Sequence, residues 1–496
     1  MSEVTVDIRD GKLRGASDGG VLAFKGIPYG APPIGARRFL PPADVEPWAG
    51  VRDALDYGPS CPQASSRPQG WAQEPRLSED CLYLNVWTPA TDGGKRPVLV
   101  WFHGGGFSIG SGSWPVYDGT ALARRGDAVV VTVNHRLNIF GYLQLAGLMP
   151  AEFASSSNAG MLDLVASLEW VRDNIGAFGG DAGNVTIFGE SGGGAKVSVL
   201  HTMPAARGLF HRAVIESGPG LRVKRPEAAA ELSKQVLADL GISAGDVKAL
   251  QALPYERLLD ANAKLGAAGA FGFSPVLDGR HITEDPRDAY ASGRAPDVPM
   301  IIGCNRDEAT LFLARDTSID DSYDDARLEK RMSSLGEDGG RIIEAYRASR
   351  PEASPRELLL AIESDRMMRI PSIELAERKI AGTKTPVYMY LFCWSAGPLG
   401  SAHGFEIAFV FDNARPPVMG ASTGRAELAS QMSEAWLAFA RTGSPDHAGI
   451  LMWPAYATDE RATMIFDRGP AQVAADPGAG ERRAWQGVKT PIGMPA

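Results

Sequence analysis

The chain has 496 residues, of which 44% are hydrophobic and 22% charged, and its formal net charge is −9. This composition is typical of a globular protein that can bury a large core. The negative charge argues against nucleic acid as a partner, because nucleic acid selects basic surfaces. We expect one large domain over residues 1–496, since α/β enzymes commonly extend a single core through loop insertions.

Signals for targeting and for metal binding are weak in this sequence. No apolar run reaches the ~18 residues that a transmembrane helix needs. Residues 1–16 (MSEVTVDIRDGKLRGA) alternate like a strand and lack the apolar core of a signal peptide. We therefore expect a cytoplasmic protein with no membrane partner. The 4 cysteines are scattered and form no Cys-x-x-Cys pair, so we expect no zinc site, and nothing implies a cofactor.

The first buried strand that we predict covers residues 97–102 (PVLVWF) and runs directly into a glycine-rich loop, His103-Gly104-Gly105-Gly106-Phe107. Glycines leave backbone N–H groups open to a substrate atom that gains negative charge during a reaction. We therefore expect Gly105 and Gly106 to donate in an oxyanion hole. The alternative is an ordinary glycine-rich turn.

A strand, a helix and a second strand follow in order. Residues 128–133 (AVVVTV) and 185–188 (VTIF) are rich in β-branched residues, as buried parallel strands are. Between them, hydrophobic residues recur at spacings of three and four, which predicts an amphipathic helix. These helix positions are Met161, Leu164, Val165, Leu168, Val171 and Ile175.

The segment Gly189-Glu190-Ser191-Gly192-Gly193 comes directly after the strand 185–188 and before an apolar helical stretch. Gly-x-Ser-x-Gly between a strand and a helix is the context of a nucleophile elbow, in which a sharp turn exposes the serine. Ser191 is the predicted nucleophile, and the N–H of Gly192 is the third predicted oxyanion donor. In a chain with 57 glycines the alternative is a plain glycine-rich loop; the strand–turn–helix context favours the nucleophile.

Three further strands are predicted at residues 212–216, 298–302 and 387–392, and a late helix is marked by Leu428, Met432, Trp436 and Phe439. Strands that alternate with helices indicate a mostly parallel, doubly wound sheet flanked by helices. Residues 221–270 and 314–370 have helical patterns without such strands. We expect both to be helical insertions that form a cap or lobe beside the sheet.

The base and the acid of a serine hydrolase follow the nucleophile in the chain when the serine lies on this kind of elbow. His201, His211, His281, His403 and His447 follow Ser191. His403 lies on a glycine-flanked loop after the strand 387–392, from which it can reach back over the strand ends, so we predict it as the base. Asp307 and Glu308 follow the strand 298–302, and the residues alone do not choose between them as the acid.

Four longer blocks resemble the type-B carboxylesterase and cholinesterase family, over about residues 5 to 455. They are Phe24–Tyr29 (FKGIPY), Glu79–Trp87 (EDCLYLNVW), residues 178–194 (FGGDAGNVTIFGESGGG) and HGFEIAFVF from His403. The resemblance implies an α/β-hydrolase fold and carboxylesterase activity through an acyl-enzyme intermediate on a small-molecule ester. It also implies Glu308 as the acid, and Gly105, Gly106 and Gly192 as the oxyanion hole. The family usually has alanine where this chain has Gly192.

The resemblance implies further roles, each with a simpler alternative. Cys61 and Cys81 match a disulfide pair of secreted members, but they stay thiols in a reducing compartment. Trp71 and Glu190 match the choline-recognition residues of cholinesterases; the alternative for Trp71 is a partly buried loop tryptophan. The family includes inactive cell-adhesion proteins, and the same triad can cleave amides or carbamates. The sequence does not indicate the natural substrate or the oligomeric state.

Overall fold

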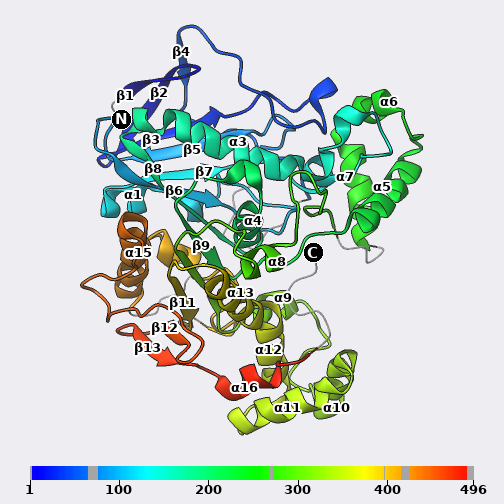
Figure 1. Cartoon of the computed structure of the whole chain (residues 1–496), viewed down its shortest axis with the longest axis vertical. Helices are drawn as coiled ribbons and strands as arrows, with labels where there is room; N and C mark the ends of the chain where they lie inside the picture. The colour runs from blue at the N-terminus through cyan, green and yellow to red at the C-terminus, as the bar shows by residue number, and fades with distance from the viewer. Residues whose placement is uncertain (1–2, 65–75, 268–271, 396, 415–423, 489–496) are drawn as a thin grey trace.

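The computed structural model describes residues 3–64, 76–267, 272–395, 397–414 and 424–488. A 13-stranded mixed sheet runs through the molecule in the order β1-β2-β3-β5-β7-β6-β8-β9-β10-β11-β12-β13, and β4 pairs with β2. Figure 1 shows helices on both faces of this sheet. The chain therefore forms the helix–sheet–helix architecture expected from the alternation of strands and helices.

The central part of the sheet is parallel. It consists of β6 (Arg96–Phe102), β7 (Val129–Val133), β8 (Gly180–Glu190), β9 (Arg212–Glu216), β10 (Met300–Asn305), β11 (Val387–Phe392) and β12 (Ala462–Phe466). The strands outside it are β1 (Glu3–Ile8), β2 (Gly11–Asp18), β3 (Val21–Pro28), β4 (Val51–Asp53), β5 (Tyr83–Thr88) and β13 (Gln472–Ala475). The six buried strands predicted from the sequence all lie in the parallel part, whereas most of the outer strands were not predicted.

The described α-helices vary from short turns to long amphipathic segments. They are α1 (Thr120–Gly126), α2 (Asn138–Tyr142), α3 (Ala159–Asn174), α4 (Gly192–Leu200), α5 (Pro226–Leu240), α6 (Val247–Ala252), α7 (Tyr255–Ala267), α8 (Pro286–Ala291), α9 (Ala309–Leu313), α10 (Asp325–Met332), α11 (Asp338–Ser349), α12 (Pro355–Ser364), α13 (Ile370–Gly382), α14 (Ile407–Val410), α15 (Arg425–Thr442) and α16 (Ala479–Ala484). Both helices predicted from hydrophobic spacing are present, as α3 and α15.

The alternation of side chains along β6 divides the core into two layers. Val98, Val100 and Phe102 belong to one hydrophobic cluster, which also contains the buried residues of α3 and α13. Leu99 and Trp101 point the other way and pack with residues of α1 and α15. Because successive strand residues face opposite sides, a strand buried on both faces is apolar throughout.

The two predicted insertions are helical, but they pack differently. In the first, α5 to α7 add Leu232, Leu250 and Leu258 to the main core. The second, residues 314–370, contains α10 to α12 and has a hydrophobic cluster of its own, which Trp485 joins from near the C-terminus. We refer to this second insertion as the helical lobe. It lies at the lower end of Figure 1, and the space-filling view shows it as a projection from the main body. The interpretation of the chain as one domain stays a prediction.

Candidate active site

The predicted nucleophile lies at a sharp turn between β8 and α4. Ser191 has φ 56° and ψ −124°, in a region that residues other than glycine rarely adopt. Its N–H donates to the carbonyl of Glu216 at 2.8 Å, and its carbonyl accepts from the N–H of Ala195 at 3.0 Å. Contacts to β9 and to α4 thus hold the strained serine backbone in place.

Glycines on either side of the serine let the elbow pack against β6. A Cβ atom added to Gly193 would lie 2.0 Å from the carbonyl oxygen of Phe102. One added to Gly189 would lie 2.6 Å from the carbonyl carbon of Gly193. No side chain fits at such distances, so the glycine pattern follows from the close approach of two backbones.

The three predicted oxyanion donors come from two segments that meet at the elbow. Gly105 and Gly106 follow β6 with φ values of 86° and 63°. Within the described ranges, no protein oxygen accepts a hydrogen bond from either N–H group. Gly192 is the first residue of α4, where a helix leaves its N–H groups without internal acceptors. The backbones of Gly106 and Gly192 are in contact, since a Cβ on Gly192 would lie 2.2 Å from the Gly106 oxygen.

His403 lies in the turn between β11 and α14 and contacts Glu308. Its Nδ1 donates to Glu308 Oε2 at 2.5 Å. The other carboxylate oxygen of Glu308 accepts the N–H of Asn305 at 2.7 Å, and the side chain is fully buried. Asp307 points elsewhere and accepts the N–H of Ser401 at 2.8 Å. Of the two carboxylates that the residues alone left open, Glu308 is the one in contact with the histidine.

The second ring nitrogen of His403 faces the end of β8. Its Nε2 lies 3.1 Å from Oε1 of Glu190, a buried carboxylate. Neither atom makes a hydrogen bond with another residue in the described part of the chain. Because Ser191 directly follows Glu190, this nitrogen lies at the elbow. The structure thus brings the predicted acid, base and nucleophile to one end of the sheet.

Several buried ionisable groups gather at the C-terminal ends of the central strands. We refer to Glu190, Glu216, Glu308, His403 and Glu406 as the carboxyl edge; four of them end or follow β8 to β11, and Glu406 lies in the same turn as His403. Burial alone lowers the pKa of His403, but the carboxylates of Glu190 and Glu308 outweigh it and raise that pKa above its ordinary value. Burial raises the pKa of Glu190 and Glu406, and brings that of Glu216 to about 8. Clusters of perturbed pKa values are typical of functional sites.

The hydrogen bonds that reach the side chains of Glu216 and Glu406 come from neutral donors rather than from cations, and one oxygen of Glu216 has no partner among the described residues. Trp436 Nε1 donates to Glu216 at 2.7 Å. Asn305 Nδ2 donates to Glu406 at 2.5 Å, and the hydroxyl of Ser217 donates to its other oxygen at 3.1 Å. The sequence analysis did not identify Glu406 or Ser217. Glu406 belongs to HGFEIAFVF, the family-like block that begins at His403. Its place in that block was the sequence feature that could have marked it as a site residue.

The other histidines that are close to the site are unsuited to act as a base. His103 and His135 stack with ring centroids 4.8 Å apart, and burial followed by the charge of Lys196 lowers both pKa values. His201 caps α4 and is also buried, which lowers its pKa. Their rings remain neutral and bond to nearby carbonyl groups.

One aromatic side chain at the site was missed. The ring of Phe312 lies 4.8 Å from that of His403, and the residue is 40% exposed. It lies in α9, which begins directly after Glu308. An apolar, partly exposed ring beside the histidine offers a contact surface for a bound molecule.

The predictions that came with the resemblance have mixed outcomes. Trp71 lies outside the described residues, so its choline-binding role stays a prediction. The carboxylate of Glu190 faces His403, and a contact with substrate is likewise untested. Cys61 and Cys81 are free, buried thiols, so of the two alternatives the structure has the reduced one. Burial, and then a hydrogen bond with Cys61, raises the pKa of the Cys81 thiol.

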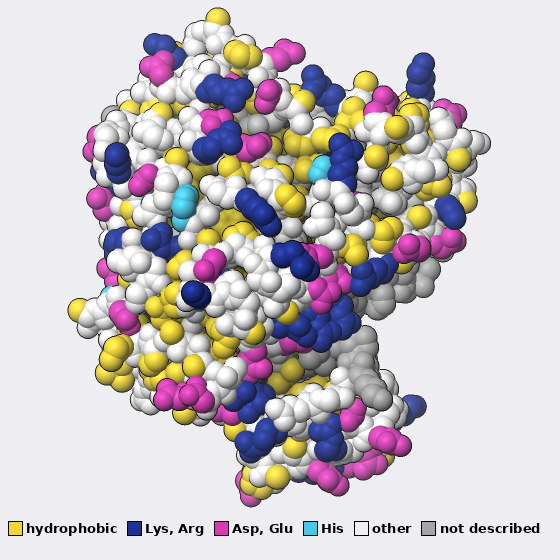
Figure 2. Space-filling model, in the orientation of Figure 1, with side chains coloured by type: hydrophobic (Ala, Val, Ile, Leu, Met, Phe, Trp, Pro, Cys, Tyr) yellow, Lys and Arg dark blue, Asp and Glu magenta, His cyan; other side chains and the backbone are white. Residues whose placement is uncertain are grey.

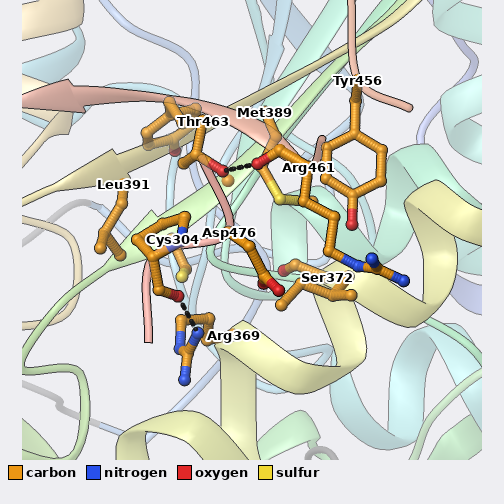
Figure 3. A pocket seen from close by; sticks show the side chains of 13 residues that line it. Cys304, Arg369, Ser372, Met389, Leu391, Tyr456, Arg461, Thr463 and Asp476 are labelled. Carbon is orange, nitrogen blue, oxygen red and sulfur yellow. Dashed lines mark hydrogen bonds between the residues drawn. The ribbon is translucent and has the colours of Figure 1, made fainter. Parts of the chain in front are cut away.

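Figure 3 shows a small cavity between β10, β11 and α13. Its volume is about 20 Å³, which is room for about one water molecule. Cys304, Met389 and Ser372 line it, and the predicted catalytic residues are not among the described residues around it.

Over the described ranges, no group of three or more His, Cys, Asp or Glu is placed to hold a metal ion.

The model of the carboxylesterase family matches residues 2–485. The chain belongs to the carboxylesterase family. The para-nitrobenzyl esterase of Bacillus subtilis is 39% identical to it, over 94% of this chain and 95% of that protein. A phenmedipham hydrolase of Pseudarthrobacter oxydans is 35% identical, over 94% and 95% of the two chains. A crystal structure of a Geobacillus stearothermophilus carboxylesterase at pH 6.2 matches with a TM-score of 0.88 and 41% identity, covering 97% of this chain and 100% of that one.

Membership of this family confirms the predicted α/β-hydrolase fold and the predicted class of enzyme. This carboxylesterase is a serine hydrolase that acts on carboxylic esters. None of its described helices combines the length and the apolarity needed to cross a membrane. The predicted cytoplasmic location stays a prediction.

Proposed function

We propose that this carboxylesterase cleaves small-molecule esters through an acyl-enzyme formed on Ser191, with His403 as the general base and Glu308 as the carboxylate that orients it. The contact between His403 Nδ1 and Glu308 Oε2, 2.5 Å long and fully buried, carries the proposal. A histidine that donates from Nδ1 to a carboxylate keeps the lone pair of Nε2 free. In His403 this nitrogen lies 3.1 Å from Oε1 of Glu190, at the elbow that presents Ser191.

In the first half of the reaction, Nε2 of His403 takes the proton of Ser191 Oγ as the oxygen bonds to the ester carbonyl carbon. The carbonyl oxygen becomes an oxyanion and accepts from the N–H groups of Gly105, Gly106 and Gly192. The carbon–oxygen bond to the alcohol then breaks, and His403 returns its proton to the departing alcohol. The acyl group remains on Ser191.

In the second half, water takes the place of the alcohol. His403 removes a proton from the water as it attacks the acyl carbon, and the second oxyanion rests on the same three donors. As this intermediate collapses, the bond between the acyl carbon and Ser191 Oγ breaks, His403 gives its proton to that oxygen, and the acid is released. The carboxylates of Glu190 and Glu308 stabilise the imidazolium that forms in each half-reaction. The same attraction raises the pKa of His403.

The substrate contacts the site beside Phe312, whose partly exposed ring lies against His403. We infer that this ring packs against an apolar part of the ester. The oxyanion donors fix the position of the ester carbonyl group. Phe312 therefore lines one wall of the space that holds the acyl and alcohol parts of the ester.

Ser191→Ala tests the assignment of the nucleophile. We expect turnover of p-nitrophenyl acetate to fall to the background level, because alanine lacks the hydroxyl oxygen that accepts the acyl group. Ser233→Ala is the control, since this serine is buried in α5, where its hydroxyl donates to the carbonyl of Ala229. Substantial activity in the Ser191 variant would contradict the proposal.

The same assay distinguishes two alternatives to this function, a binding protein without catalysis and an amidase. A binding protein without catalysis would show no difference between the wild type and Ser191→Ala. An amidase would hydrolyse p-nitroanilides at rates comparable with the matching p-nitrophenyl esters. We expect fast turnover of the esters alone, since an anilide has a much poorer leaving group and requires protonation of nitrogen by His403.

A further inference from the structure

Lys196 lies on α4, five residues after the nucleophile, and is fully buried. A lysine is almost never buried completely unless its ammonium group is bonded, because loss of hydration is costly. Its Nζ donates to the carbonyl oxygens of His103 and Gly106, both at 2.9 Å. The side chain therefore ties the elbow helix to the loop that follows β6.

The two accepting carbonyls are on either side of the peptide groups whose N–H atoms are the proposed oxyanion donors. That loop contains Gly104, Gly105 and Gly106, and the last two have positive φ. Glycine has more backbone freedom than any other residue, so a run of three needs outside restraint to hold its N–H groups in one direction. Donors that stabilise an oxyanion act through such preorganisation. Lys196 restrains the loop at both of its ends.

Gly192 makes room for this arrangement. A Cβ atom at this position would lie 2.2 Å from the Gly106 carbonyl oxygen and 2.4 Å from its Cα. The contact is to backbone, so it cannot be relieved by a rotation of a side chain. An alanine here would displace the carbonyl that Lys196 binds. The presence of Lys196 thus explains a glycine at the position where the family usually has alanine.

We propose that Lys196 is a positioning residue of the oxyanion hole, which holds Gly105 and Gly106 through the flanking carbonyls, and that Gly192 is required for its bond to Gly106. This role rests on the proposed function, since it concerns the donors that act once Ser191 attacks. Lys196 does not touch the substrate; it acts through the loop.

Lys196→Met is the first test, because methionine keeps most of the buried volume and removes the donor. We expect kcat to fall about 100-fold, as for a small displacement of a catalytic group, and KM to stay unchanged. The donors act on charge that develops in the transition state, so the affinity for a trifluoromethyl ketone should fall by the same factor. Such a ketone forms a hemiketal oxyanion on Ser191.

Lys379→Met is the matched control. Lys379 is a fully buried residue of α13, and its Nζ donates to the carbonyl of Pro296 at 3.3 Å and to the hydroxyl of Thr383 at 3.4 Å. We expect it to lower thermal stability without a change in kcat or in ketone affinity. A wild-type kcat and ketone affinity in Lys196→Met would overturn the inference. Ser191→Ala would still be inactive in that case, so the proposed function would stand.

Gly192→Ala tests the coupling and does not depend on the lysine variant folding. We expect about the same 100-fold loss in kcat, because the added methyl group displaces the Gly106 carbonyl. In the double variant Lys196→Met/Gly192→Ala the second change should cause no additional loss, since the bond it breaks is already absent. Losses that multiply, or a Gly192→Ala enzyme with wild-type kcat, would overturn the coupling. Near-UV circular dichroism verifies the fold of each variant.

Discussion

In two buried regions of this carboxylesterase, the carboxyl groups bind different kinds of partner. In the helical lobe, Asp365 is neutralised by a cation, because Arg369 Nε donates to it at 2.6 Å. At the carboxyl edge, Glu216 bonds to the indole of Trp436 and Glu406 to neutral side-chain donors. One region pairs its carboxylates with cations, and the other gathers buried carboxyl groups of raised pKa around a histidine.

The difference has a functional reason. Burial of carboxylates without cations raises their pKa and costs stability, so such clusters persist where chemistry uses them. At the carboxyl edge the gain is the increased basicity of His403, which Glu190 and Glu308 stabilise in its charged form. The helical lobe packs around its own hydrophobic cluster. Variants in the two regions should therefore separate activity from folding.

The largest effect is expected for Glu308→Gln at the carboxyl edge. The amide cannot hold the Nδ1–H tautomer as a carboxylate does, and we expect kcat to fall about 10³–10⁴-fold with little change in Tm. Steady-state hydrolysis of p-nitrophenyl acetate measures it. Asp307→Asn, on the neighbouring residue, is the matched control and should retain most of the activity. A larger loss for Asp307→Asn than for Glu308→Gln would reverse the assignment of the acid.

A core variant of the helical lobe should have the opposite profile. Leu359 is 0% exposed in α12, and we expect Leu359→Ala to lower the free energy of unfolding by about 2–5 kcal/mol. The value of kcat at 25 °C should be unchanged, because Leu359 packs in the hydrophobic cluster of the lobe, which contains none of the carboxyl-edge residues. Denaturant titration measures the stability. Leu451→Ala, at a residue that is 62% exposed, should change it by less than about 0.5 kcal/mol. A loss of kcat in Leu359→Ala would show that the lobe supports the site.

The smallest effect is a shift in pH dependence. Glu190 stabilises the protonated ring of His403, so Glu190→Gln should lower the pKa of that ring. The base is active when it is neutral, so the acid limb of kcat/KM should move to lower pH, by about 1 unit. A pH profile of p-nitrophenyl acetate hydrolysis measures it, with Glu329→Gln on the exposed face of α10 as the control. A limb that stays in place, or moves to higher pH, would contradict the coupling of Glu190 to His403.

Parts of the fold and site that depend on contiguous residues were predictable. The six parallel strands appear as short β-branched runs because both of their faces are buried. The elbow was predictable because its strand, turn and helix are adjacent in the chain. The outer strands were harder: β2 and β3 contain glycine and partly exposed residues, and β13 is largely exposed, so they lack the uniform apolar pattern.

The sequence by itself therefore predicted the nucleophile, the oxyanion glycines and the order of the catalytic residues, since each prediction depends on local patterns. From the residues alone, Asp307 and Glu308 remained equal until the resemblance favoured the second, and it is the contact with His403 in the tertiary structure that distinguishes them. The contacts of Lys196 and Glu406 also emerged only there. Their partners lie far away in the sequence, and only the packing of strand ends against one another decides which carbonyl or carboxyl group each side chain meets.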